Sequence, residues 1–91
     1  MSTILFPLGR VVATPAALEA LEASGVSLAQ LLVRHQSGDW GEVPREDARE
    51  NERSVEHGFR IISSYYAGEE RIWVITEADK SSTCLLLPSE Y

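Results

Sequence analysis

Three runs of strand-forming residues in the C-terminal third constrain the fold more than any other feature of the chain. They read FRIISSYY, RIWVIT and TCLLL, within residues 59–87, and are separated by AGEE and EADKSS. Val, Ile, Thr, Tyr, Phe and Trp suit a pleated, half-buried surface, and the separating segments contain Gly68, Asp79 and Ser81, which favour turns. The pattern predicts an antiparallel meander.

The middle run, residues 71–76, is expected to be the interior strand of the sheet. Successive side chains of a strand point to opposite faces, so Ile72 and Val74 share one face while the other carries Trp73 and Ile75. Helices are expected to cover one face. A second copy of the chain is expected to cover the other, in a homodimer formed through Trp73 and Ile75. The alternative covers are the N-terminal segment and a partner protein.

Two short helices are predicted before the meander. Thr14 followed by Pro15 is typical of a helix start, because the hydroxyl can accept from a free N–H and proline suits the first helical position. Gly25 is expected to end this helix. Ser27, with Gln30 three residues later, fits a capping box, so a second helix is expected to begin there.

A third helix is predicted over residues 45–57, which are rich in helix formers, and Gly58 is expected to end it. Residues 4–14 are strand-prone but contain Pro7 and Gly9, which suits an irregular lead-in or an edge strand. The fold class predicted for the whole chain is one α+β domain. About three N-terminal helices pack on an antiparallel sheet of three or four strands, formed mainly by the C-terminal third.

The chain is acidic, with eight basic and fourteen acidic side chains and a formal charge of −6. Such a chain repels phosphate, so direct nucleic-acid binding is not expected. A partner with a basic surface is expected instead. No apolar run approaches the roughly 20 residues that span a bilayer, and the N-terminus lacks the basic start and long apolar stretch of a signal peptide. A cytoplasmic location without membrane contact is therefore expected.

The residues with reactive side chains form no recognisable catalytic or metal pattern. Cys84 begins an apolar run, where a buried, inert thiol is expected. His35 ends a leucine stripe and His57 ends a helix, and their spacing matches no ligand set for a metal. Glu77 and Asp79 are spaced as paired carboxylates sometimes are. They lie on a predicted turn, however, and a turn in which Asp79 binds its own backbone explains them more simply. No catalytic residue, cofactor or metal is predicted, and a small hydrolase or nuclease that uses His57 or this turn is an alternative.

Residues 17–35, ALEALEASGVSLAQLLVRH, resemble a helix-turn-helix, with Gly25 at the turn. The second helix would present mainly Ser27, Gln30 and Arg34 to DNA, without the cluster of Lys and Arg that phosphate binding requires. A small transcriptional regulator is therefore a second alternative, and plain packing of two helices explains the same pattern.

The third predicted helix is the candidate partner surface. Its arginines and carboxylates alternate as on a solvated face laced with ion pairs, yet few of its residues suit a core. The carboxylates predicted to bind a partner are Glu46, Asp47, Glu50, Glu52 and Glu56.

The stretches FPLGRVVATPAALEAL, RHQSGDWGE and ITEADKSSTCLLLPSEY resemble a family of small plasmid-related proteins of bacterial plasmids and other mobile elements. Some members carry the label of a restriction-modification subunit, although a chain of this length cannot hold a methyltransferase domain. The resemblance implies that the gene lies on a mobile genetic element. Small acidic proteins encoded on such elements often inhibit host defence. By that analogy, the expected function is a non-enzymatic module that binds a larger protein or nucleoprotein complex through its acidic surface, as an anti-CRISPR or anti-restriction inhibitor.

Overall fold

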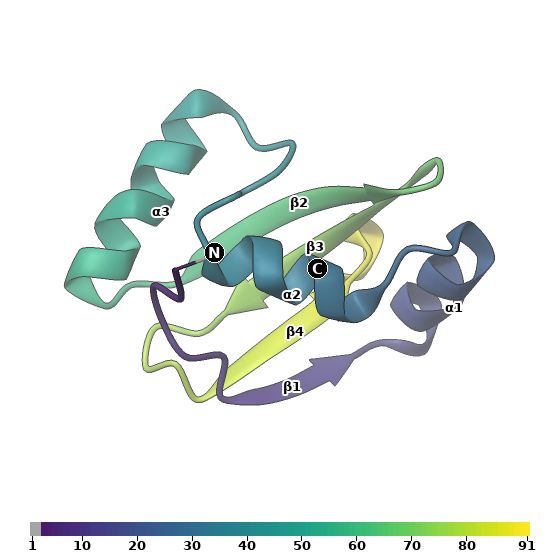
Figure 1. The fold of residues 1–91 in the computed structure, drawn as a ribbon, viewed down its shortest axis with the longest axis horizontal. Coiled ribbons are helices and arrows are strands. Elements are labelled where there is room, and N and C mark those ends of the chain that lie inside the picture. The colour runs from purple at the N-terminus through teal and green to yellow at the C-terminus, as the bar shows by residue number, and fades with distance from the viewer. Residues whose placement is uncertain (1–2) are drawn as a thin grey trace.

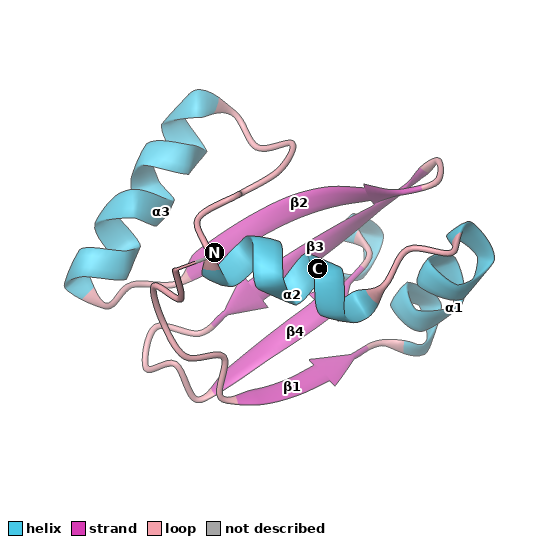
Figure 2. Ribbon diagram, in the orientation of Figure 1, coloured by secondary structure: helices cyan, strands magenta, loops and turns pink. Residues whose placement is uncertain are grey.

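The chain folds into a four-stranded sheet with helices α1 and α2 on one face and helix α3 beside one edge (Figure 1). The computed structural model describes residues 3–91. The strand order is β1-β4-β3-β2, and α2 crosses in front of β3 and β4 (Figure 2). The elements are β1 (Arg10–Ala13), α1 (Pro15–Ser24), α2 (Leu28–Gln36), α3 (Arg45–His57), β2 (Ile61–Ala67), β3 (Glu70–Thr76), β4 (Ser82–Leu86) and a short 3₁₀ helix, η1 (Pro88–Glu90).

The helices begin and end at the residues that the sequence marks for them. The Thr14 hydroxyl accepts from the Ala17 N–H at 3.1 Å, and the Ser27 hydroxyl accepts from the Gln30 N–H at 3.3 Å. Gly25 ends α1 in the left-handed conformation. Among residues 3–91, no single helix is long and apolar enough to cross a membrane. Only α1 and α2 together meet that test, as a pair with a bend of 104° between them.

The prediction of a purely antiparallel sheet is wrong, because the sheet is mixed. β2 pairs with β3 and β3 with β4 in antiparallel fashion, but β1 runs parallel to β4, with Val12 opposite Cys84. Short turns set the direction of β3 and β4. The direction of β1 is set by contacts with distant parts of the chain, including the Thr83 hydroxyl, which donates to the Leu8 carbonyl at 2.8 Å. β1 is nevertheless an edge strand, as Pro7 and Gly9 in the segment before it predict.

The core lies between the sheet and helices α1 and α2. The buried residues of this cluster are Ala17, Leu21, Leu31, Tyr65, Ala67, Ile72, Val74 and Leu85. A second, smaller cluster forms where the N-terminal lead-in and the loop before α3 meet the sheet, and contains Phe6, Trp40 and Ile61. Trp40, in the glycine-flanked loop before α3, is thus buried in this second cluster.

A buried chain of polar side chains crosses the core. His35 is 0% exposed, and its ring nitrogens lie 2.5 Å from the Ser63 hydroxyl and 2.9 Å from the Thr76 hydroxyl. The Thr76 and Thr83 hydroxyl oxygens are 2.7 Å apart, and Thr83 donates to the Leu8 carbonyl.

These contacts assign the proton on His35. A hydroxyl has one proton to donate, and the proton of Thr83 goes to Leu8, so Thr76 donates to Thr83 and must accept from His35 Nε2–H. Burial lowers the pKa of His35 to about 4, so the imidazole is neutral near pH 7 and Nδ1 accepts from the Ser63 hydroxyl.

The outer edge of β2 is covered by the chain itself. The Ser64 N–H donates to the Trp40 carbonyl at 3.0 Å, and the Glu42 N–H donates to the Ser64 carbonyl at 2.6 Å. From α3, the Asn51 amide donates to the Ile62 carbonyl at 2.7 Å and accepts from the Ile62 N–H at 3.1 Å. A bare sheet edge invites pairing with another chain, and this edge is closed to it at both residues.

Candidate functional site

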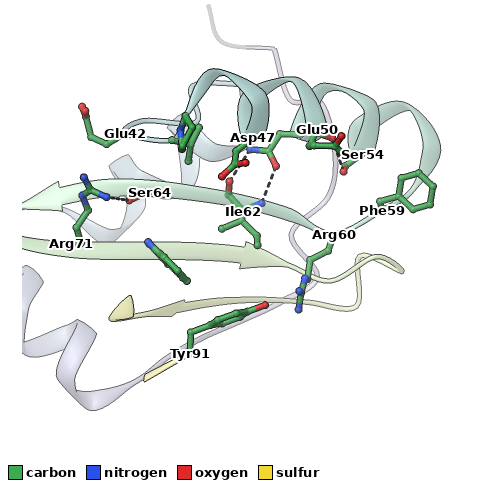
Figure 3. A pocket seen from close by; sticks show the side chains of 14 residues that line it. Glu42, Asp47, Glu50, Ser54, Phe59, Arg60, Ile62, Ser64, Arg71 and Tyr91 are labelled. Atoms are coloured by element: carbon green, nitrogen blue, oxygen red, sulfur yellow. Dashed lines mark hydrogen bonds between the residues drawn. The ribbon is translucent and has the colours of Figure 1, made fainter. Parts of the chain in front are cut away.

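A groove of about 510 Å³ lies between α3 and the sheet face that α1 and α2 leave free (Figure 3). Ile62, Ser64, Arg71 and Trp73 line it, and they alternate along β2 and β3 with the side chains buried under α1 and α2. Asp47, Glu50, Asn51 and Ser54 line it from α3, at spacings of three and four residues that place them on one side of the helix. The groove thus lies mainly between two strands, β2 and β3, and one side of helix α3.

Aromatic rings form much of the side of the groove that lies away from α3. The Trp73 and Tyr91 rings meet edge to face, with their centroids 5.4 Å apart. The Arg60 guanidinium lies over the Tyr91 ring, 5.6 Å from its centroid, and Figure 3 shows both across the groove from α3. This contact is a cation–π pair, so Tyr91 holds Arg60 in place.

Arg71 occupies the end of the groove opposite Arg60 (Figure 3). Its Nη1 donates to the Ser64 hydroxyl at 3.3 Å, its Nη2 donates to the Tyr66 hydroxyl at 3.1 Å, and its guanidinium lies 4.7 Å from the centroid of the Tyr66 ring. Its Nε is buried without an acceptor, which holds for no other buried side-chain nitrogen or oxygen of residues 3–91. An unsatisfied buried donor costs roughly 1–3 kcal/mol, so this end of the groove has an incomplete hydrogen-bond set.

Carboxylates form the wall on the α3 side. Glu50 pairs with Arg53 at 2.7 Å, but both side chains are well exposed, so this pair is weak. Asp47 and Glu42, which also line the groove, have no cation within 4.0 Å in the part of the chain that the structure describes. The wall therefore presents negative charge that the protein itself leaves unpaired.

The structure exposes all five carboxylates predicted on α3, but Glu46, Glu52 and Glu56 do not line the groove. Asp47 and Glu50 line the groove. Glu52 accepts from the Trp40 indole N–H at 3.4 Å, and Glu56 lies 4.0 Å from the His57 ring. One helix carries the predicted surface, but only part of that surface belongs to the groove.

The two residues predicted to form a dimer face are placed differently from each other. Ile75 is 4% exposed within the single chain, so it offers no open surface. Trp73 is partly exposed and lines the groove, against Tyr91. The C-terminal segment thus covers part of a face that the strand pattern leaves open. The homodimer stays a prediction, and Trp73 is the one of the two residues through which it would form.

The residues considered for catalysis are spread over the molecule. The Asp79 carboxylate accepts from the Ser81 N–H at 3.0 Å, as a turn residue does, and its contacts with Ser81 lower its pKa. Burial, with smaller effects from two carboxylates, raises the pKa of the Cys84 thiol, which is the reverse of activation. Within residues 3–91, no three His, Cys, Asp or Glu side chains are grouped so that they could hold a metal ion.

The paired helices α1 and α2 use their inner sides for packing on the sheet. Leu21 and Leu31 are buried in the main core. Arg34, the arginine that the second helix would offer to DNA, pairs with Asp39 through two contacts of 2.6 and 3.3 Å and lies over the Tyr65 ring. Its charge is engaged within the molecule, so the electrostatics of this pair do not favour DNA binding.

Arg60, Arg71 and Tyr91 are site residues that the sequence reasoning missed. The alternation of side chains along β3 does place Arg71 on the same face as Trp73, opposite Ile72 and Val74. This pattern could have assigned Arg71 to the same surface as Trp73. The return of Tyr91 over that face, and the position of α3 beside it, depend on contacts between distant segments and leave no local pattern.

No family model matches the chain, and neither a curated protein nor a solved structure does. The relation to plasmid-related proteins stays a prediction.

Proposed function

We propose that this chain is a non-enzymatic protein-binding module that docks on a larger protein or nucleoprotein complex through the carboxylates of α3. One observation carries the proposal: of the 13 residues of α3 only Asn51 and Ser54 are buried, and its only apolar contacts with the core are those of the partly buried Ala48 and Val55. A helix of a globular protein normally buries an apolar stripe. α3 adds little to the core, so most of its surface is available to a partner.

The attachment of α3 suits a rigid display of charge. The two hydrogen bonds between Asn51 and Ile62 fix the helix to the edge of the sheet. The backbone positions of the five carboxylate residues are then set, and a helix that is already ordered loses less entropy when a partner binds. The expected partner surface is basic, since opposite charges accelerate encounter and form charge-assisted hydrogen bonds.

A basic surface of this kind lines the nucleic-acid channel of complexes that handle DNA or RNA. Carboxylates that enter such a channel compete with phosphate for its Lys and Arg side chains. The resemblance to proteins of mobile elements favours a bacterial defence complex, a CRISPR effector or a restriction enzyme, as the owner of the channel. Inhibition of that complex is the proposed biological role.

Affinity purification from a bacterial host with an active defence system tests the proposal. The test variant neutralises the α3 surface through Glu46→Gln, Asp47→Asn, Glu50→Gln, Glu52→Gln and Glu56→Gln. The control variant changes net charge by the same amount at five other exposed sites, through Glu19→Gln, Glu22→Gln, Glu69→Gln, Glu70→Gln and Glu77→Gln.

We expect proteins that the wild type and the control variant retain, that the α3 variant loses, and that raised salt releases. Circular dichroism confirms that all three chains are folded. Equal retention by the α3 variant and the control would refute the role of α3.

A further inference from the structure

The groove beneath α3 has the size and form of a site for a few side chains of an extended chain. Its volume of about 510 Å³ falls within the range of roughly 300–1,000 Å³ typical of ligand sites. Figure 3 shows its labelled residues spread along the direction of β2, with Arg71 at one end and Arg60 at the other. Such an elongated site is better matched by an extended peptide than by a compact cofactor.

The floor of the groove suits an apolar side chain. Trp73, Tyr91 and Ile62 contribute two aromatic rings and one aliphatic chain. Trp73 is only partly exposed and is held by Tyr91, so its ring is already oriented before anything binds. Tryptophan and tyrosine are the residues through which protein interfaces gain much of their affinity.

The charge of the α3 wall favours a basic group in the ligand. Arg60 and Arg71 keep their positive charge, but each stacks on a tyrosine of the chain, and they lie at the two ends of the groove. Asp47 and Glu42 on the opposite wall have no cation within 4.0 Å among the described residues. The negative charge of the groove thus lies along the α3 wall, and its positive charge lies at the two arginine ends, so a basic side chain of a ligand is expected against the α3 wall.

The arginines at the ends are suited to neutral acceptors. The Arg71 Nε–H lacks an acceptor, and Arg71 lines the groove. An extended peptide presents carbonyl oxygens along its length, and a carbonyl is the acceptor that this group lacks.

We propose that the groove binds an extended segment of the partner protein, which places a Lys or Arg side chain against Asp47 and Glu50 and an apolar side chain on Trp73. This proposal rests on the proposed function, since it assigns to the docking partner a segment that enters beside α3. It also adds a short-range, sequence-selective contact to the long-range attraction of the helix.

Selection of short random peptides displayed on beads, with the wild-type protein as bait, tests the proposal. The enriched peptides are then synthesised, and their affinities are measured by NMR titration. We expect enriched peptides in which Lys or Arg is close to an aromatic or aliphatic residue. We expect the shifted resonances to come from α3, from β2 and β3 and from Tyr91.

Two double variants of equal charge change, one in the groove and one on α1, locate the binding. Asp47→Asn with Glu50→Gln changes two exposed groove residues and should weaken binding about tenfold or more, as expected for lost charge pairs in a partly enclosed site. Glu19→Gln with Glu22→Gln removes the same charge on α1, outside the groove and outside the α3 surface, and should leave affinity within about twofold. Trp73→Ala should abolish binding. If the Trp73→Ala variant does not fold, the comparison of the two double variants at exposed sites tests the proposal.

Several results would overturn the proposal: no enriched peptide, a preference for acidic peptides, or equal affinity in the two double variants. A concentration-dependent dimer that Asp47→Asn with Glu50→Gln dissociates would assign the groove to a second copy instead. The purification described above is a separate test. Capture that is lost with Glu46→Gln and Glu56→Gln, yet survives the groove variant, supports the proposed function and refutes the groove.

Discussion

At the scale of single residues, His35 should make stability depend on pH. The unfolded chain takes up a proton at His35 as pH falls through its ordinary pKa of 6.5, but the folded protein does so only near 4. Between these values the unfolded state binds more protons, so the stability present above pH 6.5 is lost as pH falls toward 4. The pKa difference corresponds to a loss of roughly 3 kcal/mol in the free energy of unfolding.

Urea denaturation at a series of pH values measures this dependence. His35→Gln removes the titrating group, so the variant should be less stable near neutral pH but show a flatter profile between about pH 6.5 and pH 5. This interval lies above the range in which the lowered pKa values of Asp39 and Glu90 matter. Parallel profiles for the two proteins would show that His35 is not buried as a neutral ring.

At the scale of elements, the segment before α3 should depend on close backbone contact with β2. Gly41 has φ of 73°, and a side-chain carbon there would overlap the Ser64 carbonyl oxygen. Gly25 has nearly the same φ, 72°, but no atom lies within 4 Å of the corresponding position. The two glycines separate the cost of a left-handed residue from the cost of a steric clash.

Gly25→Ala should lower the free energy of unfolding by about 1–2 kcal/mol, the cost of left-handed backbone for an alanine. Gly41→Ala should cost at least about 2 kcal/mol more, because it also displaces the hydrogen bonds that Ser64 makes with Trp40 and Glu42. Chemical denaturation of both variants measures the difference. Similar losses would mean that this segment does not pack on β2 as described.

The elements that the sequence predicts well are those with local signals. Thr14, Ser27 and Gly58 mark helix ends, because capping depends on neighbouring residues. The turns between β2, β3 and β4 set antiparallel pairing in the same local way. The parallel pairing of β1 depends instead on the lead-in, where Gly9 lies against the backbone of Ser81, and no neighbouring residue encodes that contact.

The candidate site was partly predictable for the same reason. The carboxylates of α3 are visible as a pattern within one helix. The groove is not, because it needs α3 beside β2, the alternation of β2 and β3, and a C-terminus that returns to Trp73. The prediction of an open sheet face failed to anticipate this return, and as a result it treated Ile75 as accessible.

At the scale of the whole molecule, the last four residues should act as a cover for the sheet. Glu90 accepts from the Thr14 hydroxyl at 2.7 Å and from the Leu87 N–H at 2.9 Å, and these contacts lower the pKa of its carboxyl. Tyr91 packs on Trp73. The segment thereby joins the end of the chain to the start of α1.

Deletion of residues 88–91 should expose Trp73 to water and leave an apolar patch on the sheet. We expect tryptophan emission to shift to longer wavelength, the free energy of unfolding to fall by roughly 1–3 kcal/mol, and self-association to increase in sedimentation equilibrium. Glu90→Gln keeps the ring of Tyr91 in the chain and serves as the control. Unchanged fluorescence and association in the truncated chain would refute a covering role.

The central claim is that partners dock on the carboxylates of α3 and its groove. Carboxylate footprinting tests it most directly: the protein is labelled at Asp and Glu side chains with a water-soluble carbodiimide, alone and with a captured partner, and the modified sites are quantified by mass spectrometry. We predict strong protection of Asp47 and Glu50 by the partner, and unchanged labelling of Glu19 and Glu22 on α1. Protection of the α1 carboxylates, with Asp47 and Glu50 labelled as in the free protein, would contradict the account.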